Sequence, residues 1–293
     1  MSLRTSRLLL VLAALLFSTG GAAIKALSLT GWQRASFRSA VAARFLLAVL
    51  PAARRRPDLP TVLVSAGYAV TMVSFVLANT YASAATAIFT QSLAPLFVLL
   101  LAPWLLREAV TRRDLALMAA LAVGYGCLLS APETATRTAP DPRLGLVFAS
   151  CSCLGWSATL LGLRMLARAH AEHGRDATPQ ALVLGNALAF AVALPAALPV
   201  GHVAAADVLL LLYLGVFQIG LAYVCLSKGL RTVPALEASL LLMLEPVLNP
   251  VWTWLLHGEN PHPRTWLGGA IVLAATAAHA FAGARARGRV QPA

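Results

Sequence analysis

The chain has 293 residues, of which 59% are hydrophobic and only 12% are charged. A soluble fold could not cover so much apolar surface with so few charged groups, so the composition excludes a water-soluble protein and indicates a lipid environment. The formal net charge of +12 does not indicate a nucleic-acid partner, because the basic residues form short clusters between apolar runs, as in membrane proteins.

Ten apolar segments along the chain are candidates for membrane-spanning helices, each of which needs about 20 residues. None of the segments alternates polar and apolar residues as the strands of a membrane barrel do. The predicted spans, in chain order, are Leu8–Ile24, Ser39–Ala53, Val62–Ala78, Ala84–Leu106, Leu115–Ala131, Leu144–Leu163, Ala181–Leu198, Val208–Leu226, Ala235–Leu256 and Trp266–Ala284. The expected fold class is therefore an all-α integral membrane protein with ten transmembrane helices.

The first two spans need comment. The first follows Arg4 and Arg7, as the apolar part of a signal peptide does, but its apolar run continues to Ile24 and we expect it to be retained. The second is short and contains Arg44, so we expect it to begin earlier, near Phe37.

Most of the 23 lysines and arginines fall on one side of the membrane when the N-terminus is placed inside. Clusters such as residues 54–56 and 112–113 then mark the cytoplasmic side, as the positive-inside rule requires. An even number of spans puts both termini in the cytoplasm, and we predict a multi-pass protein of a bacterial inner membrane.

An internal repeat relates the fourth and ninth spans, because residues 84–108 align without a gap on residues 235–259. In each copy a proline, Pro95 or Pro246, lies thirteen residues before a glutamate, Glu108 or Glu259. Two halves of five helices follow, and because five is odd the second half must be inverted in the membrane. We predict a first half over residues 1–131, an extracytoplasmic linker over 132–143, a second half over 144–284 and a basic cytoplasmic tail over 285–293. Inverted repeats are characteristic of secondary transporters.

Several short motifs repeat a known pattern: FSTGG at 17–21, SLAP at 92–95, LRE at 106–108, LEP at 244–246 and HGE at 257–259, together with Lys25 and Arg38. On these residues the chain resembles the EamA-type members of the drug/metabolite transporter superfamily. The resemblance implies a ten-helix inner-membrane protein with two inverted halves. It is shared with exporters of amino acids, metabolites and drugs, and it does not select a substrate.

Glu245 is the only carboxylate well inside a predicted span. Inserting a charge there costs at least about 2.5–3.5 kcal/mol, so such residues are rarely accidental. Asn249 lies four residues on and shares its helix face, which we expect to point into the protein. Pro246 frees the carbonyl of Leu242 and predicts a kink beside the carboxylate. We predict that Glu245 and Asn249 bind solute or a proton; the alternative is that Glu245 pairs with a base and only fixes helix packing.

Five other residues inside the spans complete the predicted binding or coupling site. Gln91 takes the position that Leu242 has in the repeat, so the two halves would bring different chemistry to one cavity. Trp156 lies mid-span, where it is either a cavity wall or core packing. The remaining three are Gln218, Tyr223 and Ser18.

Lys25 and Arg38 lie at the extracytoplasmic ends of the first two spans, against the positive-inside bias. Three interpretations stay open: they pair with Glu245, they attract anions to a mouth, or their side chains extend to the lipid headgroups. Glu108 and Glu259, at helix ends among basic residues, are expected to be structural.

We therefore expect a secondary transporter that exports small amphipathic solutes by alternating access, with protons as the coupling ion. The chain has no P-loop for ATP and none of the zinc or serine motifs of hydrolases, and we expect no enzyme activity, cofactor or metal. The expected partners are the lipid bilayer, a small-molecule solute and protons, for a monomer or homodimer. An intramembrane enzyme and a receptor or scaffold without transport remain the alternatives.

Overall fold

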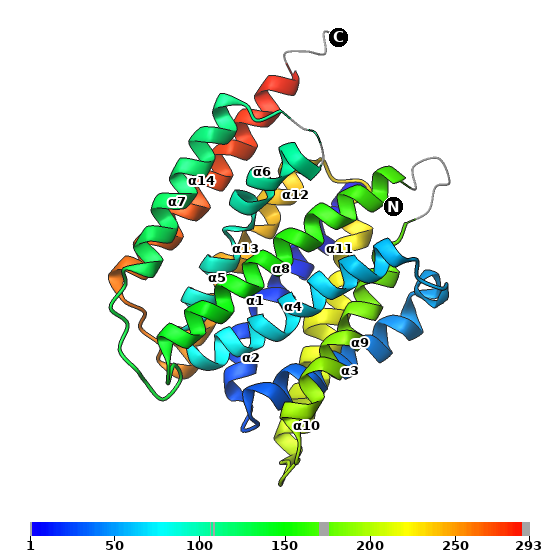
Figure 1. Ribbon diagram of the computed structural model, residues 1–293, viewed down its shortest axis with the longest axis vertical. Coiled ribbons are helices and arrows are strands. Elements are labelled where there is room, and N and C mark those ends of the chain that lie inside the picture. Colours follow the sequence, from blue (N-terminus) through cyan, green and yellow to red (C-terminus); the bar gives the residue numbers. More distant parts are fainter. Residues whose placement is uncertain (1, 106, 108, 170–175, 289–293) are drawn as a thin grey trace.

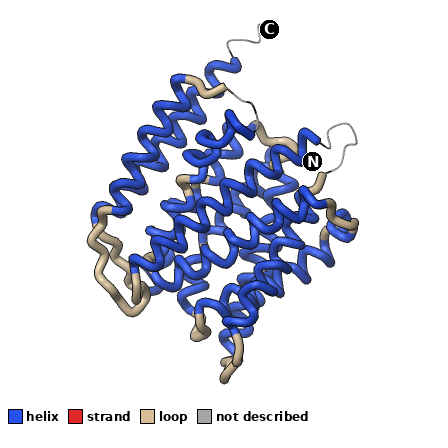
Figure 2. Tube along the Cα trace, viewed as in Figure 1, coloured by secondary structure: helices blue, strands red, loops and turns tan. Residues whose placement is uncertain are grey.

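The computed structural model describes residues 2–105, 107, 109–169 and 176–288. Every regular element in these ranges is a helix, and Figure 2 shows helices joined by loops. Three parts of the sequence-based predictions, Leu106, Glu108 and residues 289–293 of the tail, lie outside the described residues.

The helices follow one another along the chain in two groups. The first group is α1 (Leu3–Ser18), α2 (Gly20–Ala26), α3 (Gly31–Val49), the 3-10 helix η1 (Pro51–Arg54), α4 (Leu59–Tyr81), α5 (Ala84–Gln91), α6 (Ala94–Leu105) and α7 (Arg112–Leu129). The second group is α8 (Pro142–Ala169), α9 (Thr178–Ala197), α10 (Ala205–Leu212), the π-helix η3 (Tyr213–Leu221), α11 (Ala222–Gly229), α12 (Ala235–Leu242), α13 (Leu244–His257) and α14 (Pro263–Gly288).

Local sequence determines where several of these helices begin. The Thr30 side chain accepts a hydrogen bond from the Gln33 backbone N–H and the Gln33 side chain returns one, a capping box that starts α3 at Gly31. The helix therefore begins before the expected start near Phe37. Arg34 and Arg38 lower the hydropathy of the first two turns of α3, so a prediction from hydropathy left these turns out. Ser83 caps α5 in a similar way, through the backbone N–H of Thr86.

Eight helical segments are long and apolar enough to cross a membrane. They are 3–26, 59–81, 84–105, 142–168, 178–197, 205–229, 236–257 and 263–283. The other two predicted spans are also helical, as α3 and α7, but they are more polar. α3 contains three arginines, and α7 starts with two arginines and an aspartate.

The helices at the centre of the bundle come from both groups, since α4 packs against α8 and α9, and α1 packs against α11. α7 and α14 lie side by side at one edge, and α1 begins at the end of the bundle where α14 ends (Figure 1). Side chains from both groups form one large buried cluster, so the two groups share a core.

The contact between α4 and α8 depends on small residues. A Cβ atom on Gly155 would lie 2.9 Å from the backbone oxygen of Gly67 and from the backbone nitrogen of Thr71. Glycine allows the two backbones to approach closely, as is common between helices in membranes.

Replacing Gly155 with valine is expected to lower the free energy of unfolding by about 1–3 kcal/mol, because the larger side chain forces α4 and α8 apart. Gly126→Ala is the matched control, since no atom lies within 4 Å of the position its Cβ would take. Thermal unfolding of both variants in detergent measures the difference. Equal stability of Gly155→Val and the wild type would contradict this description of the contact.

Candidate functional site

A cavity of about 250 Å³ lies among helices from both groups. It is lined from the first group by α1, α3, α4 and α5, and from the second by α8, η3, α11, α12 and α13. The lining residues are Phe17, Arg38, Met72, Phe75, Ile88, Gln91, Ser92, Trp156, Gln218, Ile219, Tyr223, Leu226, Leu242, Glu245 and Pro246.

Two helix breaks form part of the cavity wall. The predicted fourth span is divided between α5, which ends at Gln91, and α6, and the ninth between α12, which ends at Leu242, and α13. These two residues occupy equivalent positions in the sequence repeat, and both line the cavity. Pro95 and Pro246 each lie in the first turn of the helix that follows. A backbone N–H in the first turn has no hydrogen-bond acceptor within its own helix, so the lack of an N–H in proline costs no helical hydrogen bond there. The linking residues Ser92 and Met243 keep right-handed helical dihedrals, so each proline accompanies a local interruption of one helical segment, in agreement with the kink expected at Pro246.

Glu245 lies in the first turn of α13 and borders the cavity. The positive end of the helix dipole favours a negative charge at this position. Among the described residues, no side chain forms a hydrogen bond or an ion pair with the Glu245 carboxylate. A partly buried carboxylate of this kind is free to bind a solute group or a proton.

Gln218 of η3 and Tyr223 of α11 line the same cavity as Glu245. The Gln218 amide donates to the backbone oxygen of Phe17 at 3.3 Å, and its own oxygen has no partner among the described residues. The ring of Tyr223 meets Phe17 edge-on, with centroids 5.0 Å apart. Trp156, for which packing and a cavity wall were both open, lies partly exposed in the wall.

Two of the predicted site residues, Ser18 and Asn249, do not line this cavity. Ser18 is fully buried, and its hydroxyl accepts a hydrogen bond of 2.9 Å from the indole of Trp252. Asn249 is also fully buried, one turn along α13 from Glu245, and no described group bonds to its amide atoms. A Cβ atom on Gly21 would lie 2.6 Å from the Asn249 oxygen and 3.0 Å from the Asn79 oxygen. Asn249 thus points inward, toward the contact between α2 and α4.

Lys25 pairs with Glu259, not with Glu245. Its ammonium nitrogen lies 2.7 Å from the Glu259 carboxylate, and the two side chains are only 2% and 4% exposed. Lys25 also donates to the backbone oxygens of Ala82 and Thr138, at 2.8 and 2.6 Å. Glu259 accepts a further hydrogen bond of 3.0 Å from the backbone N–H of Ala84, at the start of α5. This Lys25–Glu259 cluster joins α2, α5, the 132–143 segment and the end of α13.

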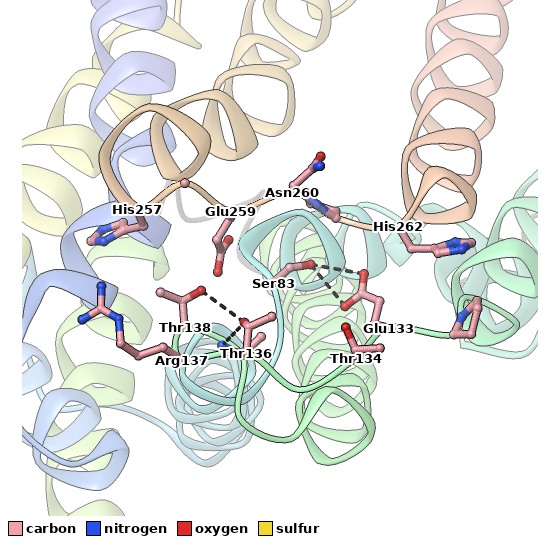
Figure 3. Close-up of a pocket in the computed structure, with 14 residues that line it drawn as sticks. Ser83, Glu133, Thr134, Thr136, Arg137, Thr138, His257, Glu259, Asn260 and His262 are labelled. Atoms are coloured by element: carbon pink, nitrogen blue, oxygen red, sulfur yellow. Dashed lines mark hydrogen bonds between the residues drawn. The ribbon is translucent and has the colours of Figure 1, made fainter.

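A second, polar cavity of about 360 Å³ lies beside that cluster (Figure 3). Glu133 lines this cavity and accepts hydrogen bonds from Thr86 at 2.8 Å and from Thr265 at 2.7 Å. Figure 3 also shows Ser83 next to the Glu133 carboxylate. Sequence reasoning treated residues 132–143 only as a linker and missed Glu133, because nothing in its neighbourhood marks it as more than a loop carboxylate.

Comparisons with known proteins identify a family from the sequence and, separately, a similar fold. A family model described as the EamA-like transporter family matches residues 5–130 and 143–279. No curated protein sequence matches the chain. A solved structure titled "Crystal structure of protein" is 19% identical, with a TM-score of 0.62 over 94% of this chain and 98% of that one. At this identity the similarity shows the fold alone.

Proposed function

Because the chain belongs to the EamA-like transporter family, we propose that it is a secondary transporter that exports small amphipathic solutes, such as metabolites, amino acids or drugs. The observation that carries the proposal is the cavity, which is lined from both groups of helices and holds Glu245 without a partner among the described residues. A receptor or scaffold would need no such cavity. The family's described activity also favours transport over an intramembrane enzyme.

We propose further that all ten predicted helices cross the membrane, in two inverted halves over residues 1–131 and 144–284. The breaks after Gln91 and Leu242, at equivalent positions of the repeat, support this symmetry. α3 and α7 would then cross as well, with Arg38 of α3 turned inward and buried. Discontinuous helices at the centre of inverted repeats are a recurrent feature of secondary transporters.

The orientation follows from the clusters of basic residues, which place both termini in the cytoplasm of a bacterial cell. The start of α1 and the end of α14 lie at one end of the bundle (Figure 1), and Lys25 stands at the end of α2, one helical crossing along the chain from the start of α1. The Lys25–Glu259 cluster would therefore close the extracytoplasmic side. A transporter closed on that side is ready to take up its cargo from the cytoplasm, and this supports export.

Proton coupling is proposed to act through Glu245. Proton coupling needs a group that binds a proton in one of the inward-open and outward-open states and releases it in the other. A carboxylate without a basic partner can bind and release a proton in this way. Solute would leave the cavity toward the outside, a proton would then bind to Glu245 from that same side, and the protein would release this proton to the cytoplasm after it reopens inward.

Purified protein in liposomes is expected to move solutes from an unbiased metabolite mixture against their gradient when a pH gradient is imposed. Mass spectrometry of the vesicle contents identifies the cargo, and protein-free vesicles are the control. Dissipating the gradient with a protonophore should stop accumulation. Solute movement that needs no pH gradient would refute coupling, and no movement beyond that in protein-free vesicles would refute transport.

A further inference from the structure

Arg38 is a charged residue in the cavity wall that the proposed mechanism does not use. It lies on α3 and is the largest fully buried side chain of the described residues, only 1% exposed. Its guanidinium borders the cavity, and its contacts are the backbone oxygen of Met72 at 3.5 Å and the Met72 sulfur at 3.7 Å. The distance to the oxygen is long for a hydrogen bond of a charged donor, and a thioether sulfur is only a weak acceptor.

The charge of Arg38 is not balanced by an acid. A buried guanidinium is normally paired with a carboxylate, because an unpaired charge in an apolar interior is strongly unfavourable. Glu245 is the acid in the same cavity, yet no contact within 4.0 Å joins the two side chains. The Arg38 Nε also lacks a partner among the described groups. Arg38 therefore presents unused hydrogen-bond donors to the cavity.

The remainder of the wall is largely apolar and aromatic. Phe17, Phe75 and Trp156 line the same space as Arg38. A guanidinium offers a planar set of donors that matches a carboxylate with two parallel hydrogen bonds. A ligand that satisfies this cavity has a carboxylate at one end and an apolar body at the other.

We propose that Arg38 is the anion-binding group of the cavity, and that the cargo is a small amphipathic carboxylate. This inference rests on the proposed transport function and narrows its substrate class. The cargo carboxylate takes the place of the acid that Arg38 lacks, while the apolar body packs on the aromatic side chains. Simple cationic amines are poor ligands of this group, because they meet the positive charge of Arg38. An amine could pair with Glu245 of the same cavity only when that side chain is ionised, so the binding test is made at mildly acidic pH, where Glu245 holds a proton.

Equilibrium binding to the purified, full-length protein tests the proposal with two matched pairs of probes. The pairs are 3-phenylpropionate with 2-phenylethylamine, and 4-methylpentanoate with 3-methylbutylamine, measured by calorimetry in nanodiscs. The wild type is expected to bind each acid at least ten times more tightly than the matching amine. Arg38→Gln is expected to weaken acid binding at least ten-fold and to remove the preference.

Arg44→Gln is the matched control, since Arg44 lies on the same helix but is exposed, and it should keep the preference. Arg38→Lys keeps the charge without the planar donors, so it should bind the acids with an affinity between those of the wild type and Arg38→Gln. This second variant keeps the proposal testable if Arg38→Gln does not fold. The proposal is overturned if either Arg38 variant binds the acids as the wild type does, or if the wild type prefers the amines or binds neither acid. Binding is read without a gradient, so a failure of proton coupling in liposomes leaves this test intact.

Discussion

Replacing Glu245 with glutamine is expected to abolish the accumulation of solute that a pH gradient drives in liposomes. Glu245 is the only carboxylate among the residues that line the cavity, and no described side chain pairs with it. Glutamine keeps the size of the side chain and can still form hydrogen bonds, but it cannot take up or release a proton in this range of pH. The variant should still exchange solute across the membrane when solute is present on both sides.

The measurement compares gradient-driven accumulation with exchange of labelled cargo in the same vesicles. Glu237→Gln is a suitable control, because Glu237 lies on the neighbouring helix α12 in a surface ion pair with Arg7, with side chains 32% and 47% exposed. Such exposed pairs contribute little, so this variant should behave as the wild type. Undiminished accumulation by Glu245→Gln would remove Glu245 from the coupling step.

Replacing Lys25 with methionine is expected to lower the free energy of unfolding by about 3–5 kcal/mol, because it leaves the Glu259 carboxylate buried without its base. The Glu259 side chain is only 4% exposed, so its charge would be poorly hydrated once the ammonium group is gone. Thermal unfolding in detergent should show a clearly lower midpoint for Lys25→Met.

The double variant Lys25→Met with Glu259→Gln should recover much of this loss, because neither charge is then left buried. Arg7→Met removes the base of the exposed pair and should change stability by less than about 1 kcal/mol. A Lys25→Met protein as stable as the wild type, or a double variant less stable than Lys25→Met, would contradict a buried pair that stabilises the bundle.

Hydropathy predicted the helical segments well, because an apolar run of about 20 residues is characteristic of a membrane-spanning helix. Helix occurs in each of the ten predicted ranges, and eight segments are apolar enough to span a membrane. The prediction from hydropathy failed where a helix contains charged or polar residues. The first turns of α3 contain Arg34 and lie before the predicted range, although Thr30 and Gln33 form an evident capping box.

The central cavity was partly foreseeable. Polar residues within apolar spans are costly, so Glu245, Gln91 and Gln218 were expected to meet in the interior, and all three line one cavity. The partner of Lys25 was not foreseeable, because Glu259 lies more than two hundred residues away in the chain and only the packing of α2 against α13 brings them together. The roles of all these residues remain predictions that the experiments above address.

The Glu259 carboxylate makes two contacts at once, and this limits how the bundle can rearrange. One oxygen of the carboxylate meets Lys25 and the other holds the first N–H of α5, so a movement that draws away the end of α13 removes both contacts together. A half-opened form would leave the buried ammonium group without its carboxylate and the start of α5 without its hydrogen-bond acceptor, which is unfavourable. Such intermediates should be sparsely populated. Single-molecule recordings of the distance between the end of α13 and the start of α5 should therefore switch abruptly between two values, with no intermediate value between them.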